Sequence, residues 1–262
     1  AYVLVAAALA PAGRMLLGQR GPALAAGLPG LNPCLAALAL PAFFQTAWSD
    51  IWMWLVLIGC VAATVVLGHV LVAILPFPIL TLPFVIVFWT VYALAPHSSV
   101  LEAKPSGSAV PADFQLILAT LSSLGEVVFA PSAWSGLLVL AGILVSNRRH
   151  AVVAVVGAVI GACVPYYYHS ADPVSSDLGL YGFNGVVTAV AVYVLCGSDV
   201  RLAILGALVA TIMLPAIAQL GIPPVTAPLV LSTWLLLMIG WLDQRLFAPP
   251  PHRNGEPDAP TR

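Results

Sequence analysis

The residues best able to do chemistry in this chain are polar side chains set inside long apolar stretches. Glu126 is the only acid within such a stretch, and Thr81 and Thr226 each sit between prolines. An ionisable group inside an apolar span is a candidate for function. It can instead have a structural role, as a helix cap or in an interhelical hydrogen bond. Each proline frees a backbone carbonyl, so a threonine hydroxyl can either re-satisfy that backbone or face a pore as donor and acceptor at once.

The surroundings of these residues indicate the class of protein. Of the 262 residues, 61% are hydrophobic and only 7% are charged, and the mean hydropathy is +1.04. Soluble domains carry about 25% charged residues, so this composition excludes a water-soluble globule and also intrinsic disorder. The formal net charge of −1 offers no basic surface for nucleic acid. We therefore expect an all-α, multi-pass membrane protein.

The chain shows no spacing typical of an enzyme, a metal centre or a cofactor site. GxSxG, HExxH and Walker motifs do not occur in it. The four cysteines are scattered and none has CxxC spacing, which favours small apolar packing residues over a zinc site or disulfides. We expect no catalysis, no metal and no cofactor. Because the polar groups within the spans are mostly uncharged, a neutral polar solute fits better than an ion.

Apolar segments separated by polar residues predict the elements that must position these groups. At about 20 residues per crossing, ten segments are expected, over residues 1–17, 28–44, 51–75, 77–95, 114–130, 134–145, 151–168, 181–196, 202–220 and 225–241. The segment 114–130 is short, carries Glu126 and is broken by Pro131, so we expect a re-entrant half-helix there. The Pro-rich charged tail at residues 247–262 is expected to be disordered and cytoplasmic.

Basic residues predict the orientation, because loops rich in Lys and Arg stay on the cytoplasmic side. If the tail is inside, the arginines all lie inside with it: Arg14, Arg20, Arg148, Arg149, Arg201 and Arg245. Lys104 then falls outside, with the acidic Asp50, Asp172 and Asp177. This asymmetry holds only if residues 114–130 enter and leave on the same face of the membrane.

Two motifs occur twice, and in the same order. Residues 27–32 (GLPGLN) resemble residues 179–184 (GLYGFN), and residues 78–84 (PILTLPF) resemble residues 223–229 (PPVTAPL). In both copies of the second motif a tryptophan follows the threonine by eight residues. These tryptophans are Trp89 and Trp234. The chain therefore contains an internal repeat.

The predicted orientation makes the two copies inverted. The helix after Asn32 starts inside and the helix after Asn184 starts outside, although both asparagines also suit simple N-caps. Inverted repeats place a substrate site near the membrane midplane. We expect a first repeat at residues 1–95, an extracellular linker at 96–112, a second repeat with the pore half-helix at 113–246, and the tail at 247–262. Gly157 and Gly161 form a GxxxG pair, which predicts close helix packing.

These motifs together resemble the urea transporter family. Residues 77–84 and, more loosely, 222–229 are similar to the family signature LPxxTxPF, and residues 179–184 match its GLYGFN segment letter for letter. Residues 124–129 (LGEVVF), followed by residues 134–136 (WSG), are similar to its pore half-helix. The resemblance covers essentially the whole chain up to the tail.

The resemblance implies passive, channel-like diffusion of urea through a pore in each protomer of a homotrimer, in the cell (inner) membrane. Each inverted repeat would have five spanning helices and one re-entrant half-helix. Glu126 would belong to a ladder of oxygens, and Val127 and Phe183 would form an apolar slot. The other implied lining residues are Phe129, Leu35 and Val187, the hydroxyls of Thr81 and Thr226, and Leu31 in the place of an aromatic ring. The expected partners are urea, the lipid bilayer and further copies of the chain.

The chain also departs from the family pattern. Ala1 falls within what resembles the second spanning helix, so we expect a fragment or a mis-started reading frame without the first re-entrant and spanning helices. Leu31 and Leu229 stand where the family has aromatic rings, and Pro33 replaces a glycine. These departures leave open a channel for other small amides, a proton-coupled secondary transporter that uses Glu126, and a non-transporting membrane scaffold.

Overall fold

The protein is helical throughout the part of the chain that can be described. The computed structural model describes residues 1–18, 21, 27, 30–47, 49–98, 100–104, 113–169 and 173–247. Within these residues there is no strand, and one isolated β-bridge joins Phe44 and Ala103. The predicted all-α class is confirmed. The predicted tail beyond residue 247 lies outside the described residues, as do Arg20 and Asp172.

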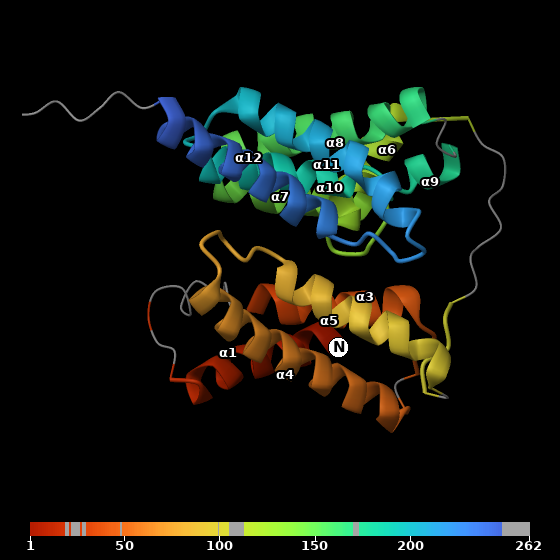
Figure 1. Cartoon of the computed structure of the whole chain (residues 1–262). Coiled ribbons are helices and arrows are strands. Elements are labelled where there is room, and N and C mark those ends of the chain that lie inside the picture. Colours follow the sequence, from red (N-terminus) through yellow and green to blue (C-terminus); the bar gives the residue numbers. More distant parts are fainter. Residues whose placement is uncertain are drawn as a thin grey trace, which may run out of the picture.

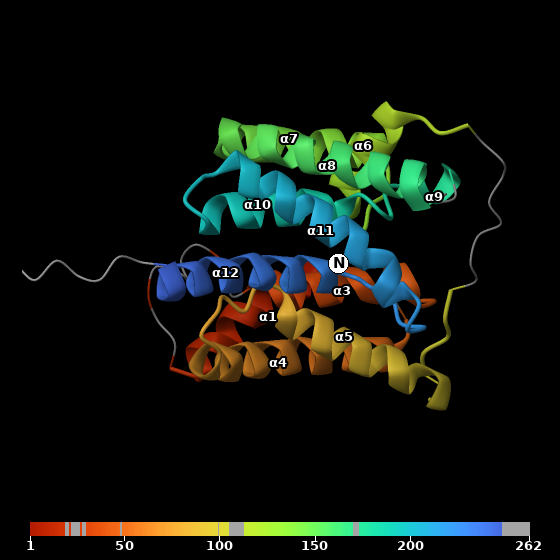
Figure 2. The same ribbon diagram turned by 45° about the horizontal axis from the view of Figure 1, so that its top comes forward.

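The helices form two groups that lie side by side (Figures 1 and 2). The first group consists of α1 (Tyr2–Leu16), α3 (Leu31–Phe43), α4 (Ile51–Ile74), α5 (Leu82–Leu94) and the short 3-10 helix η2 (Ala95–His97). The second group consists of α6 (Leu116–Glu126), α7 (Ala133–Ser146), α8 (Arg148–His169), α9 (Pro173–Asp177), α10 (Phe183–Leu195), α11 (Val200–Ala218) and α12 (Ala227–Phe247). We call these the first and second groups below.

Three helices are long and apolar enough to cross a membrane: Ile51–Ile74, Arg148–Tyr168 and Val200–Ala218. At 1.5 Å per residue, about 20 residues span the hydrocarbon core. Asp50 and Asp199 cap two of these helices, because each side chain accepts a hydrogen bond from a backbone N–H in the first turn. The chain is therefore an all-α membrane protein.

Each group has its own packing. In the first group large side chains such as Leu40, Met53 and Phe84 are completely buried between α3, α4 and α5. In the second group glycines bring α8 and α10 together. A Cβ added at Gly161 would lie 2.6 Å from the carbonyl oxygen of Gly182, and one at Gly157 would collide with Gly185. The predicted close packing of the GxxxG pair is confirmed.

Helix α6 reaches only part of the way along the second group. The ring of Phe114, just before α6, stacks on Tyr166 near the end of α8, with centroids 4.1 Å apart. Helix α7 ends at Ser146, immediately before α8 begins at Arg148. Residues 114 and 148 therefore lie at opposite ends of α8, so α6, the turn after it and α7 together pass along α8 once. This geometry agrees with a segment 114–130 that enters and leaves on the same face, whereas the membrane sides stay a prediction.

One predicted span is partly wrong. Residues 77–95 were expected to be one apolar segment, but α5 begins only at Leu82. Prolines at positions 76, 78 and 83 remove backbone donors and disfavour helical geometry in the residues before them. Leu80 has a positive φ of 48°, and in the second group Val225 has a φ of 39° just before α12. Both helices are thus preceded by a non-helical loop.

Candidate functional site

The loops before α5 and α12 are held by the same hydrogen bond. The side-chain amide of Asn32 donates to the carbonyl of Leu80 at 3.0 Å, and that of Asn184 donates to the carbonyl of Val225 at 2.8 Å. A left-handed backbone costs a non-glycine residue roughly 1–2 kcal/mol, so these bonds offset strain at Leu80 and Val225. The interpretation of the asparagines as N-caps is wrong, since Gly30 and Gly182 occupy the N-cap positions.

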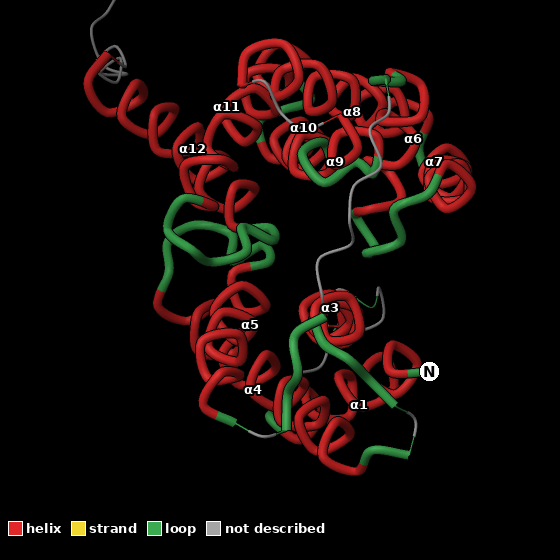
Figure 3. Tube along the Cα trace, turned by 90° about the vertical axis from the view of Figure 1, so that its right-hand side faces the viewer, coloured by secondary structure: helices red, strands yellow, loops and turns green. Residues whose placement is uncertain are grey.

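Two tryptophans connect each loop to the opposite group. The indole Nε1 of Trp89 on α5 donates to the carbonyl of Pro223 at 2.8 Å. The indole Nε1 of Trp234 on α12 donates to the carbonyl of Pro78, also at 2.8 Å. Figure 3 shows the loops before α5 and α12 meeting between these two helices. The two groups are therefore joined by a reciprocal pair of bonds at the loops that carry the threonines.

Thr81 and Thr226 lie on the wall of an apolar cavity between the groups. Thr81 and Thr226 are each 5% exposed, and neither Oγ1 atom has a hydrogen-bond partner among the described residues. The alternative that these hydroxyls re-satisfy the freed backbone is therefore wrong. Both line a cavity of 290 Å³. Other predicted residues on its wall are Leu31, Leu35, Val127, Phe183 and Val187.

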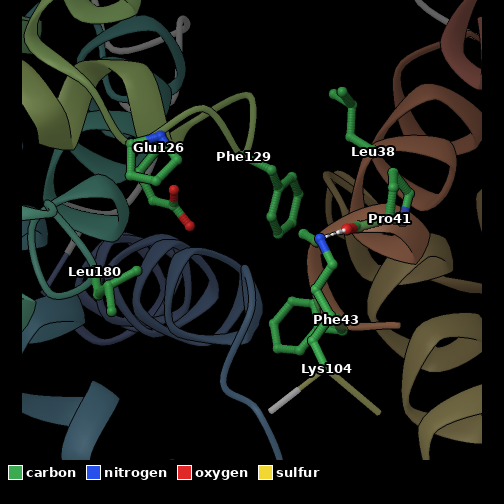
Figure 4. Close-up of a pocket in the computed structure, with 9 residues that line it drawn as sticks. Leu38, Pro41, Phe43, Lys104, Glu126, Phe129 and Leu180 are labelled. Atoms are coloured by element: carbon green, nitrogen blue, oxygen red, sulfur yellow. Dashed lines mark hydrogen bonds between the residues drawn. The ribbon is translucent and has the colours of Figure 1, made fainter. Parts of the chain in front are cut away.

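Glu126 lies at the end of α6, away from the threonine cavity. Its side chain is 9% exposed, and its Oε2 atom has no hydrogen-bond partner among the described residues. It lines two cavities, of 520 and 270 Å³, together with Phe43, Phe129 and Leu180. Figure 4 shows the carboxyl group of Glu126 and the ring of Phe129 pointing into the space opposite Phe43 and Lys104.

The cavity of 270 Å³ shares lining residues with each of the other two cavities. Phe183 lines both the cavity of 270 Å³ and the cavity that holds the threonines. The cavities of 270 and 520 Å³ share Glu126 and Phe129. The series therefore leads from Lys104 and Glu126, past Phe183, to the threonines, and every residue predicted for the site lies on one of its walls.

Phe129 does not line the same cavity as Leu35 and Val187. It was expected in the middle with Leu35 and Val187, but these two line the threonine cavity and Phe129 lines the cavities of Glu126. Its backbone has a positive φ of 56°, which turns the chain after α6. Its ring meets Phe43 and Phe84 of the first group edge-on, each with centroids 6.3 Å apart. Phe129 thus fills space between the two groups.

Sequence reasoning missed several residues at this site. Lys104 donates to the carbonyl of Pro41 at 2.6 Å beside the cavity of Glu126, but its sequence neighbourhood gives no sign of this. Leu180 also lines that cavity and lies within a recognised motif. The cross-bonds of Trp89 and Trp234 had a signal, namely their identical spacing from the two threonines. The partners of the indoles were invisible because they lie in the other half of the chain.

A helical membrane protein with a mostly apolar series of cavities and a few buried, uncharged oxygens belongs to the class of membrane transport proteins. A family model described as urea transporter matches residues 1–240. The chain belongs to the urea transporter family. This is a transport family and not an enzyme family, and membership implies transport of urea across a membrane.

Proposed function

We propose that the protein is a passive urea channel whose narrow part is the cavity between Thr81 and Thr226. The observation that carries this proposal is a pair of buried hydroxyls without partners, on two threonines that line one apolar cavity between the groups. Buried polar groups are normally hydrogen-bonded. Two that are free, at matching positions on the wall of the same cavity, are explained by a solute that completes their bonds in passing.

The chemistry of urea suits this cavity. Urea is flat and neutral, with N–H donors on both sides and one carbonyl acceptor. The walls at Val127, Phe183 and Val187 are apolar, so they select flat shape and strip water. Each threonine hydroxyl can accept from a urea N–H or donate to its carbonyl. A series of such shallow sites replaces the hydrogen bonds lost to water without trapping the solute.

The same cavity offers little to stabilise an ion. No charged side chain of a described residue lines it. Moving an unpaired ion into such surroundings costs far more than moving a neutral amide. We therefore expect flux that does not depend on membrane potential and that saturates only weakly.

The matched loops support an arrangement of two inverted repeats, residues 1–95 and 113–246. The same asparagine-to-carbonyl bond and the same tryptophan-to-proline bond occur in both groups. A two-fold axis between the loops would relate each bond to its counterpart. Such an axis near the membrane midplane would put the threonines at the centre of the path.

The setting we propose follows the family. The protein is multi-pass in the cell (inner) membrane, with the lipid bilayer around it, and it forms a homotrimer with a pore in each protomer. The linker at residues 96–112 is extracellular. Lys104, which lines the outermost cavity of the series, then marks the outer mouth.

Urea permeability of proteoliposomes, measured by stopped-flow light scattering, tests the channel. The comparison includes wild type, Thr226→Val and Thr211→Val as a matched control. Thr211 is also buried, but its hydroxyl already donates to the carbonyl of Ala207 at 2.7 Å. We expect Thr226→Val to lower urea flux about 3- to 10-fold, because one hydrogen bond is worth about 1 kcal/mol. Thr211→Val should conduct like wild type, and an ionic current or a flux equal to that of empty vesicles would refute the proposal.

A proton-coupled transporter is the second candidate, because Glu126 is a buried carboxyl with a free oxygen beside the path. A coupled mechanism would accumulate urea against its gradient when a proton gradient is imposed. Glu126→Gln keeps an acceptor oxygen and removes the proton site, so it should abolish such accumulation. Passive flux predicts no accumulation and a similar rate in Glu126→Gln, within about 2-fold by the same hydrogen-bond argument.

A further inference from the structure

The reciprocal bonds of Trp89 and Trp234 serve no step of the proposed transport. Building on the proposed function, we propose that these two tryptophans are positioning residues that fix the width of the slot between the threonine loops and thereby decide which amides pass. Both indoles donate across the gap between the groups at 2.8 Å. Their acceptors are the carbonyls three residues before each threonine, at Pro78 and Pro223.

The two bonds and the chain between them form a closed ring. From Thr81 the ring follows α5 to Trp89, crosses to Pro223 and reaches Thr226. From Thr226 it follows α12 to Trp234 and crosses back to Pro78, next to Thr81. A helix of eight residues is about 12 Å long and stiff. Because both long sides of the ring are helical and stiff, the two bonds together help to fix the distance between the loops.

Local packing holds each indole in place. The ring of Phe77 lies against that of Trp234, with centroids 6.3 Å apart and planes at 37°. Ile222, at the matching position in the other loop, packs with Trp89 against the core of the first group. Each loop therefore contributes an acceptor to the opposite indole, and Phe77 also gives the indole of Trp234 an apolar support. The contact is built into the loops that carry the threonine hydroxyls, so a shift of the contact moves those hydroxyls.

The bonds also solve a local problem for the loops. Pro78 and Pro223 lie outside the helices, so their carbonyls have no N–H donor from a helical turn. The indole of tryptophan can only donate a hydrogen bond, so it needs an acceptor from elsewhere. In an apolar setting each of these carbonyls needs an indole donor and each indole needs a carbonyl acceptor. Both bonds are therefore costly to break, which makes the ring stiff. Stiffness at the narrowest place is what discrimination between a small and a slightly larger amide requires.

Selectivity tests the proposal. Trp89→Phe, Trp234→Phe and the double variant keep a large ring and lose the donor. Trp134→Phe is the matched control, because Trp134 is 79% exposed. Urea and 1,3-dimethylurea fluxes are measured on the same vesicles, and the readout is the ratio of the two. We expect each single variant to lower the urea preference about 5-fold, a size typical of one or two methyl groups in a pocket.

The double variant should resemble the single ones, since breaking either bond already opens the ring, and Trp134→Phe should keep the wild-type ratio. A merely structural role would lower both fluxes in proportion and leave the ratio unchanged. That result would overturn the proposal. So would an effect of the double variant equal to the product of two independent single effects.

Hydrogen exchange of the indole N–H groups tests the ring without reference to flux. In wild-type protein, NMR should find slow exchange for Trp89 and Trp234 and fast exchange for Trp134. Trp234→Phe should speed the exchange of Trp89. Fast exchange of both indoles in wild type would overturn the ring. If wild-type vesicles pass no more urea than empty ones, the proposed channel fails and the ring is judged by exchange alone.

Discussion

The loops before α5 and α12 are alike in their hydrogen bonds and unlike in their surroundings. Each has a left-handed residue held by an asparagine and a carbonyl held by the opposite tryptophan. Leu31 and Phe183 hold matching positions in the repeat, but Leu31 is 49% exposed and Phe183 is 8% exposed. In the second group α6 and α7 supply Val127, Val139 and Ile143 to the same cavity wall as Phe183. The hydrogen bonds that hold the two loops are thus the same in both groups, whereas closure of the cavity depends on the helices packed beside each loop.

The two groups also differ in how the loop-holding helix is packed. In the second group Gly185 of α10 lies directly against Gly157 of α8. The matching position in α3 is Pro33, which is buried in the first turn of its helix, where a proline is tolerated. The same asparagine geometry is therefore reached with close glycine packing on one side and without it on the other.

The largest effect should come from filling the glycine contact. A Cβ at Gly185 would meet the carbonyl oxygen of Gly157, and backbone cannot yield as a side chain can. We expect Gly185→Ala to cost about 2 kcal/mol or more in the free energy of unfolding, as overpacking of a tight contact does. The melting temperature in detergent measures this. Gly59→Ala is the control, because nothing lies near a Cβ at Gly59, and it should melt with wild type.

If Gly185→Ala melted with wild type, the two groups would not differ in packing as described. Pro33→Ala sharpens the comparison in the other group. It should shift the melting temperature less than Gly185→Ala, because it removes atoms from the first turn of α3 instead of adding them to a tight contact.

The next largest effect should be a difference in stability between variants of the two asparagines. Asn32 makes two bonds, since its Oδ1 also accepts from the backbone N–H of Phe84 at 3.0 Å. The Oδ1 of Asn184 has no partner among the described residues. A buried group left without its partner costs about 1–3 kcal/mol, so Asn32→Ala should be more destabilising than Asn184→Ala. Chemical or thermal unfolding in detergent checks the order, and the reverse order would show that the two loops are not held as described.

The threonines should be equivalent if the loops form one site. Thr81→Val should lower urea flux about 3- to 10-fold, like Thr226→Val, because each removes one hydroxyl from the same cavity. Thr64→Val is a control in the first group, where the hydroxyl already bonds to the carbonyl of Cys60 at 2.9 Å. The melting temperatures should not fall, since the lost hydroxyls have no protein partner. A loss of flux in only one of the two variants would mean that the threonines do not share a path.

The smallest effect should come from exchanging the unequal wall residues. Phe183→Leu makes the second group resemble the first, and Leu31→Phe does the reverse. We expect Phe183→Leu to raise N-methylurea flux relative to urea about 2-fold and Leu31→Phe to lower it, because wall volume sets the size limit of a slot. The same pair bears on the alternative of a general small-amide channel. Equal urea and N-methylurea flux in wild type would favour that alternative.

Much of the architecture could be predicted from the sequence because each signal for it is local. An apolar run of sufficient length forms helix wherever water is absent, since its backbone must satisfy itself. The all-α membrane class could be predicted in this way. Pro131 predicted a break soon after Glu126, and α6 ends still earlier than expected, at Glu126 instead of residue 130. The repeated motifs identified Thr81 and Thr226 as a pair, because a pattern that recurs at a fixed spacing needs no knowledge of distant contacts.

Other features depended on contacts that a sequence does not display. The asparagines suited N-caps by position, but their partners are carbonyls 48 and 41 residues away. The partners of Trp89 and Trp234 are 134 and 156 residues away, in the other group.

By itself, the sequence determined most of the helical segments and which polar residues lie in or next to them, because composition and proline placement act within a few residues. Only the tertiary structure decided which atoms those polar residues meet. Hydrogen-bond partners and cavity walls are set when the two groups come together, and neighbours in space then replace neighbours in the chain.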